Sequence, residues 1–294
     1  MTFLQLVAHL FLLLLWTRLW VRPQQEFYFN PFLSGPTRLM DTIIGFLRPA
    51  LMLPERMTAL VLLLLFWAFQ AIFFIRFGNT MWQLFGQAPL TPSDEALSWG
   101  IRFAYSGLHT AQFLLRVWTI YFFVRLITPP PTRVTRAQEV FTFCTRPFSW
   151  LPLLVQPLVL FALYFALVFA ATRTGSVIHF VRGEQSIPGI VVDGTVWAQF
   201  LKIGTLALMS FIAGLQMLIH VLIFLVLGGL TATIFGAQLF RAICNESVDA
   251  LLGRFARKLV FAGGFDCTPL VAIIVLDVLS SAILVSLIKF LLSQ

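Results

Sequence analysis

Residues 269–292 read PLVAIIVLDVLSSAILVSLIKFLL, and Asp277 and Lys289 are the only charged residues among them. An apolar helix of about 20 residues spans the hydrocarbon core of a bilayer. Five earlier stretches are similarly long and apolar, namely residues 3–20, 57–75, 108–127, 151–171 and 206–230. The sequence therefore predicts an all-α membrane protein with about six transmembrane helices.

The composition of the whole chain agrees with this fold class. Hydrophobic residues make up 59% of the 294 residues and charged residues 11%, whereas soluble domains carry about 25% charge. The net charge of +8 does not indicate a nucleic-acid partner, because the basic residues lie in short segments beside the apolar stretches. There they are expected to act as topology signals and to contact anionic headgroups.

The positions of the basic residues also predict the topology. Most of the 20 Lys and Arg residues lie between the first and second, the third and fourth, and the fifth and sixth apolar stretches. The positive-inside rule places these connections in the cytoplasm and both termini outside. The first stretch lacks the basic start and the cleavage site of a signal peptide, so we expect it to be a retained span.

An internal repeat is visible in the segments predicted to be cytoplasmic. The pattern acid, six residues, Arg-Pro, four residues, Pro occurs at residues 41–54 and again at 139–152. Three histidines, His9, His109 and His220, lie 39, 37 and 37 residues before Arg48, Arg146 and Arg257. We therefore predict three units, at residues 1–80, 91–175 and 195–294, each with an entry span, a cytoplasmic segment and an exit span. The outer loop at 176–194 has β-branched residues around a turn-rich centre, which predicts a small hairpin.

The three cytoplasmic segments mix apolar residues and charges at helical spacing. We expect them to lie in the headgroup plane, with basic side chains toward phosphate or a partner protein. These side chains are Arg48, Arg146, Arg254, Arg257 and Lys258. The alternative is an ordinary solvated loop.

The third segment carries the most specific motif. Gly263-Gly264-Phe265-Asp266-Cys267-Thr268-Pro269 leads directly into an apolar span. It resembles the signature of the YggT family, a Gly-Gly-x-Asp-x-Ser-Pro-like element after an arginine-bearing interfacial segment, with Thr268 where serine is usual. The match covers about 45 residues, and the first two units match in outline. The resemblance implies a bacterial inner-membrane or plastid-type membrane protein, linked to membrane organisation, ion homeostasis or assembly of membrane complexes.

The residues of this motif also have a physical interpretation. The glycines permit a tight turn, and Asp266 can cap the helix that Thr268-Pro269 begins. The alternative is a carboxylate that contacts a ligand.

Two charges lie inside predicted spans. At about 1.5 Å rise per residue, Arg116 is roughly 18 Å and Asp277 roughly 12 Å from the cytoplasmic boundary. A charge at the bilayer centre costs about 2.5–3.5 kcal/mol and is normally paired. We expect an ion pair between spans three and six, and the alternative is a proton or ion path.

No catalytic motif accompanies these features. The sequence has no GxxxxGK[ST], HExxH or GxSxG element, and its three cysteines show no CxxC pair. His9, His109 and His220 predict hydrogen bonds between helices, with haem ligation as the alternative. We expect no enzyme, metal or cofactor. The preferred hypothesis is a membrane scaffold or accessory subunit that contacts lipids and other membrane proteins or itself, and the second is an ion or small-solute pathway.

Overall fold

The computed structural model describes residues 3–20, 34–77, 82–85, 88–91, 99–128, 135–173, 177–182, 185–190, 195–260 and 266–293. The chain forms two compact units. The first comprises Met1–Phe66, Phe123–Pro152 and Leu222–Pro269, and the second comprises Trp67–Phe122, Leu153–Val221 and Leu270–Gln294. These boundaries differ from those of the three predicted repeats, so the repeat arrangement stays a prediction.

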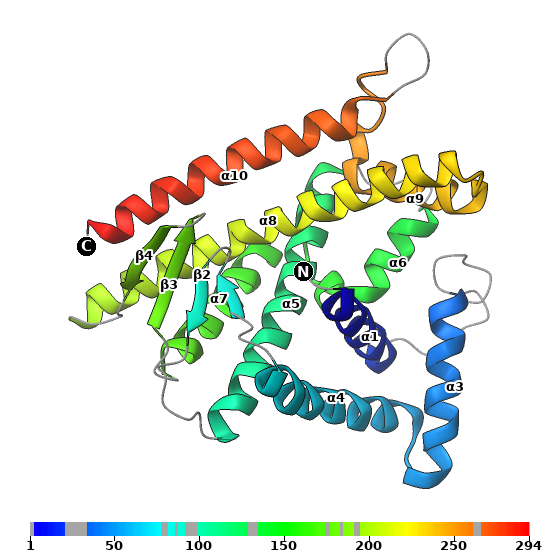
Figure 1. Ribbon diagram of the computed structural model, residues 1–294, viewed down its shortest axis with the longest axis horizontal. Coiled ribbons are helices and arrows are strands. Elements are labelled where there is room, and N and C mark those ends of the chain that lie inside the picture. Colours follow the sequence, from blue (N-terminus) through cyan, green and yellow to red (C-terminus); the bar gives the residue numbers. More distant parts are fainter. Residues whose placement is uncertain are drawn as a thin grey trace. The chain divides into compact units, whose positions relative to one another are not determined.

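Long helices occupy the positions of the predicted spans (Figure 1). They are α1 (Phe3–Trp20), α4 (Glu55–Phe77), α5 (Trp99–Ile127), α7 (Gln156–Arg173), α8 (Val196–Ile234) and α10 (Thr268–Leu292). Five of them, α4, α5, α7, α8 and α10, are long and apolar enough to cross a membrane, and α1 contributes a shorter apolar helix at Ala8–Trp20. The described part of the chain is therefore that of a helical, multi-pass membrane protein, while a count of six spans stays a prediction.

Helix α8 is one continuous helix of 39 residues. Its length and the pair Gly228-Gly229 suggest a break at that point, but the helix runs through both glycines. A Cβ atom at Gly228 would lie 3.3 Å from Sγ of Cys244, and one at Gly229 would lie 3.4 Å from Oδ1 of Asn245. The missing side chains thus allow a neighbouring helix to approach closely, as small residues do in membrane proteins.

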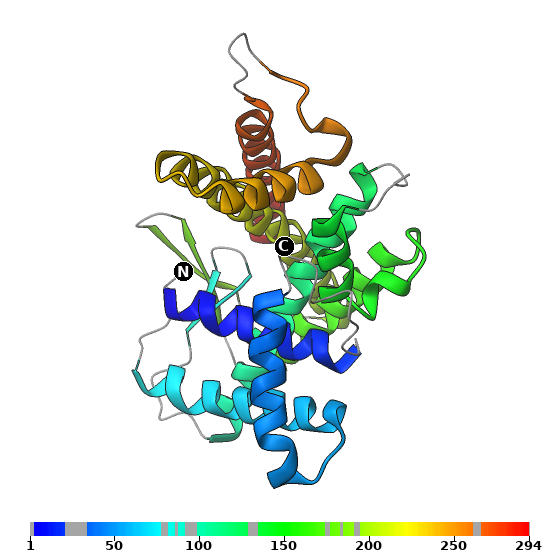
Figure 2. The ribbon, with the colours of Figure 1, turned by 90° about the vertical axis from the view of Figure 1, so that its right-hand side faces the viewer.

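Shorter amphipathic helices connect the spans on the predicted cytoplasmic side. They are α3 (Ser34–Leu51), α6 (Arg136–Cys144) and α9 (Gln238–Leu252), with 3-10 turns at Phe148–Trp150 and Gly253–Phe255. All three belong to the first unit, in which α1 contacts both α3 and α6, and α6 contacts α9. Figure 2 shows α3 crossing α1. Leu12 and Leu15 of α1 and Met40 and Ile44 of α3 are buried.

The two copies of the Arg-Pro pattern have different local structures. Pro49 lies inside α3, which continues to Leu51. The corresponding Pro147 follows the end of α6 at Cys144 and precedes the 3-10 turn. Equal spacing in the sequence therefore does not impose equal secondary structure.

Four short strands add a small sheet to the helical fold. They are β1 (Trp82–Phe85), β2 (Ala88–Thr91), β3 (Val177–Arg182) and β4 (Gln185–Ile190), antiparallel in the order β1-β2-β3-β4 (Figure 1). The hairpin predicted within residues 176–194 is confirmed by β3 and β4. The pairs Leu90–Ile178 and Thr91–Val177 join it to β2, so strands from two predicted outer loops share one sheet.

Candidate functional site

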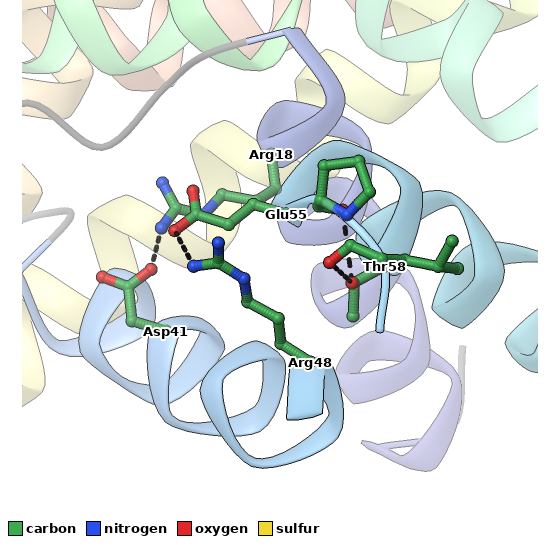
Figure 3. Close-up of polar contacts among 7 residues, drawn as sticks. Arg18, Asp41, Arg48, Glu55 and Thr58 are labelled. Carbon is green, nitrogen blue, oxygen red and sulfur yellow. Dashed lines mark hydrogen bonds and ion pairs between the residues drawn. The ribbon is translucent and has the colours of Figure 1, made fainter. Parts of the chain in front are cut away.

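Two ion pairs join α3 to its neighbours α1 and α4 (Figure 3). Arg18, in the last turn of α1, pairs with Asp41 of α3. The two side chains are 10% and 24% exposed. Nη1 of Arg48 lies 3.7 Å from Oε1 of Glu55, and both of these side chains are about half exposed. Asp41, the acid of the first Arg-Pro pattern, thus anchors α3 to α1.

Arg146 joins α1 to the end of α6. The indole N–H of Trp16 donates a hydrogen bond of 2.8 Å to the carbonyl of Arg146. The guanidinium of Arg146 lies 4.9 Å from the ring centre of Phe143 and 5.8 Å from that of Trp150, in the range of cation–π attraction. Trp150 also meets Trp20 edge-on, with ring centres 6.1 Å apart. Arg146 therefore has aromatic contacts within the chain, and no phosphate is needed to account for its position.

Helix α6 begins against α9. Thr135 and Gln138 form a capping box at its start, which satisfies two free N–H groups. Oε1 of Glu246 accepts a hydrogen bond of 3.4 Å from the N–H of Ala137, and a negative charge is favourable at a helix N-terminus. These contacts join the second and third amphipathic segments.

The third segment holds an exposed ion pair between Arg257 and Asp249. Nη2 of Arg257 lies 2.6 Å from Oδ2 of Asp249. The hydrogen bond and charge of Asp249 raise the pKa of Arg257 above its ordinary value. Arg254 lies 5.2 Å from the ring centre of Phe255, and both Arg254 and Lys258 are exposed. The basic side chains of this segment are therefore accessible at its surface.

The end of the Gly-Gly-x-Asp-x-Thr-Pro motif, from Asp266 onward, leads into α10, which begins at Thr268. Oδ1 of Asp266 accepts a hydrogen bond of 2.9 Å from the N–H of Thr268, which is the geometry of a helix cap. The Thr268 hydroxyl accepts one of 3.0 Å from the N–H of Leu259. Thr268 and Pro269 are buried, whereas Gly263 and Gly264 lie outside the described residues. The side chains of Asp266 and Thr268 thus bond to backbone N–H groups and stabilise the start of α10.

Arg116 lies in the second unit, on a polar face of α5. At about 100° per residue, His109, Gln112, Arg116 and Thr119 share one side of the helix. Gln112 and Thr119 are buried, and Nε of Arg116 is buried without a hydrogen-bond partner in the described part of the chain. The Thr119 and Tyr164 hydroxyls lie 3.0 Å apart, within hydrogen-bond distance.

The structure does not join Arg116 to Asp277. Neither residue takes part in an ion pair within the described ranges, and the Asp277 side chain is exposed. Depths that differ by about 6 Å are compatible with a pair, but depth alone leaves the direction of each side chain open. Among the described residues, the expected ion pair is therefore not formed.

The three histidines differ in their surroundings. His9 is buried in α1, His109 is half-buried in α5, and His220 is exposed on α8. Nδ1 of His220 lies 2.6 Å from the carbonyl oxygen of Gln216 in the same helix, so this contact is not between helices. In the described residues no group of three or more His, Cys, Asp or Glu could hold a metal ion.

Comparison with known proteins identifies no relative. No family model, curated protein or solved structure matches the chain. The resemblance to the YggT family therefore stays a prediction that rests on the residues of the motif.

Sequence reasoning missed several residues of this arrangement. Arg18 lies at the end of an apolar stretch, where an arginine is usually a topology signal, and nothing in the sequence identifies Asp41 as its partner. The polar face of α5 could have been found, because His109, Gln112, Arg116 and Thr119 recur at steps of three and four. The role of Tyr164 needed the packing of α7 against α5.

Proposed function

We propose that the chain is a non-catalytic scaffold or accessory subunit of a membrane, whose amphipathic segments lie at the lipid surface and whose spans pack against partner helices. The observation that carries this proposal is the second apolar face of α3. Met40 and Ile44 are buried against the rest of the first unit, whereas Leu39 and Phe46, two turns apart, are 56% and 81% exposed. An aromatic ring this exposed is unfavourable in water.

Charges next to this face support a position at the membrane surface. Arg38 and Arg48 are exposed on the same helix. An interfacial helix buries its apolar side about 5–10 Å into the boundary between headgroups and acyl chains, while its cations contact anionic headgroups. With Leu39 and Phe46 in the acyl boundary, both arginines can reach phosphate.

The membrane position of α3 can be tested with a spin label. The native cysteines, Cys144, Cys244 and Cys267, are replaced, and a single cysteine is introduced at Phe46 or, as the control, at Gly45. A Cβ atom at Gly45 meets nothing within 4 Å, so the control site tolerates a side chain. We expect oxygen to relax the label at 46 more strongly than a water-soluble nickel complex does, with the reverse at 45. Equal access of the nickel complex to both labels contradicts an interfacial α3.

The accessory role requires companion proteins. Purification in a mild detergent, followed by identification of the chains that remain bound, should give a complex of constant composition. A chain that always elutes alone as a monomer contradicts the proposal.

The polar face of α5 favours a second candidate, an ion or small-solute pathway. The partly buried Arg116, together with Gln112 and Thr119 on the same face, could contact a polar solute inside the bilayer. Flux of chloride or a small carboxylate into liposomes tests this function, with Arg116→Gln as the matched variant. Flux that equals that of empty liposomes rejects the pathway.

A further inference from the structure

Helix α10 is the least covered of the apolar helices. Only 6% of its membrane-compatible stretch, Thr268–Leu291, is buried, against 50% for Ser106–Ile127 of α5. Apolar side chains that face lipid need no protein cover, so this exposure alone indicates no partner. The exposed side chain of Asp277 on the same helix does indicate a partner, because a carboxylate that faces lipid needs a compensating group.

Asp277 is far from both ends of α10. Asp277 lies nine positions after Thr268, which corresponds to about 14 Å along the axis. The whole helix has 25 residues and is about 37 Å long. The aspartate side chain is too short to reach the headgroups from this depth. The carboxylate therefore lies in the hydrocarbon region, where an ionised group needs a compensating partner.

The chain does not supply that partner in its described part. The ion pairs there are Arg18–Asp41, Arg48–Glu55 and Arg257–Asp249. The hydrogen bond of Asp277 involves its backbone carbonyl, which accepts from the Ser280 hydroxyl at 3.2 Å.

The residues around Asp277 form a seam suited to a second helix. Leu270, Ile274, Asp277 and Ser281 follow one another at steps of four, three and four, so they share one face of α10. All four are exposed. A small hydroxyl residue such as Ser281 permits close approach of helices in a membrane. The opposite face, with Val275 and Leu279, is also exposed but offers no polar side chain at this depth.

We propose that this seam binds a transmembrane helix of another protein that carries an arginine or lysine in its middle third. The inference rests on the proposed accessory function and names the helix and the charge through which the partner is held. A cation opposite Asp277 would neutralise the carboxylate and make charge-assisted hydrogen bonds in a low-dielectric environment. A symmetric contact between two copies of α10 would instead bring two carboxylates together, and like charges at close range repel each other.

Site-specific photo-crosslinking in native membranes tests this interface. Benzoylphenylalanine replaces Ile274 or Ser281 on the seam, and Val275 or Leu279 as the matched controls on the opposite face. We expect at least tenfold more protein adduct from the seam than from the controls, and a tenfold loss of that adduct with Asp277→Asn. The adducted peptide should come from a transmembrane segment that contains arginine or lysine. Exchanging the charges, with Asp277→Lys here and aspartate in place of the partner's cation, should restore the adduct.

Several outcomes would overturn the proposal. They are equal adducts from both faces, adducts unchanged by Asp277→Asn, adducts with lipid alone, and adducts only with a second copy of this chain. Because Asp277 is exposed, Asp277→Asn should leave the unfolding midpoint of the purified chain unchanged, so a loss of adduct would not report misfolding. Companion chains that remain bound to this variant would refute the α10 interface alone, whereas the absence of any companion would refute the accessory function.

Discussion

The contact between α1 and α3 should depend on the Arg18–Asp41 ion pair. The Arg18 side chain is 10% exposed and that of Asp41 is 24% exposed, so water screens the pair only partly. Removing one partner of a fully buried pair costs about 3–5 kcal/mol, and exposed pairs contribute about 0.2–1 kcal/mol. For this partly buried pair we expect Asp41→Asn to lower the free energy of unfolding by about 2 kcal/mol, because it leaves a largely buried guanidinium without its counter-charge.

The Arg48–Glu55 pair provides a matched control in the same unit. Its nitrogen and oxygen atoms are 3.7 Å apart, and the side chains are 57% and 46% exposed. Glu55→Gln should therefore lower the free energy of unfolding by less than about 0.5 kcal/mol. Raising the salt concentration should reduce this small effect further but change the effect of Asp41→Asn little, since screening acts mainly on exposed charges.

Reversible unfolding in mixed micelles of a mild detergent and dodecyl sulfate can measure both effects. Trp16 and Trp20 lie on α1 beside Arg18, so tryptophan fluorescence should report the loss of this contact. The double-mutant cycle of Arg18→Met and Asp41→Asn should give a coupling energy of about 1.5 kcal/mol, within the range for residues in contact. Additive single effects, or equal losses for Asp41→Asn and Glu55→Gln, would refute the reasoning.

Three other predictions concern particular side chains. Burial raises the pKa of Cys144 to about 11, so its thiol stays protonated at pH 8. Maleimide should therefore modify the more exposed Cys267 before Cys144. Mass spectrometry can follow this difference in rate, and unfolding the protein should remove it. Gly253 has φ +53° and a Cβ atom there would lie 2.6 Å from a threonine hydroxyl, whereas Gly236 has φ +70° in open space. Gly236→Ala should lower the free energy of unfolding by about 1 kcal/mol, and Gly253→Ala should lower it by clearly more. Equal unfolding midpoints for the two variants would contradict this prediction. Tyr164→Phe removes a 3.0 Å hydrogen bond to a threonine of α5 and should lower the free energy of unfolding by about 1–2 kcal/mol, which the same micelle assay measures.

The long helices were predictable because the requirement for a span is local. About 20 apolar residues suffice, and the predicted stretch 269–292 differs from α10 (Thr268–Leu292) by one residue. The hairpin of β3 and β4 was predictable for a similar reason, since β-branched residues and a turn are adjacent in the chain. Its pairing with β2 was not, because that contact joins segments more than eighty residues apart.

The different fates of the two Arg-Pro patterns depend on tertiary contacts. After α6, the N–H of Thr145 bonds to Phe141 and the carbonyl of Arg146 accepts from Trp16, so the chain is held in a turn by groups outside the pattern. In the first copy, the corresponding stretch remains helical through Pro49. The spacing of charges and prolines predicted a repeated unit, but it could not predict in which copy the helix would continue through the Arg-Pro pair.

The two charges inside the spans show why depth is insufficient to predict a pair. Depth follows from a position in the sequence and a rise of about 1.5 Å per residue, whereas direction depends on how each helix is rotated in the packed structure. Arg116 belongs to a buried polar face with Gln112 and Thr119, so the groups that compensate it must come from the interior of the bundle. Asp277 is exposed on the least covered of the five membrane-compatible helices, and no cation of the described residues pairs with it. An ion pair between Arg116 and Asp277 would have compensated both charges within the chain, whereas their separate surroundings mean that each charge needs a compensating group of its own.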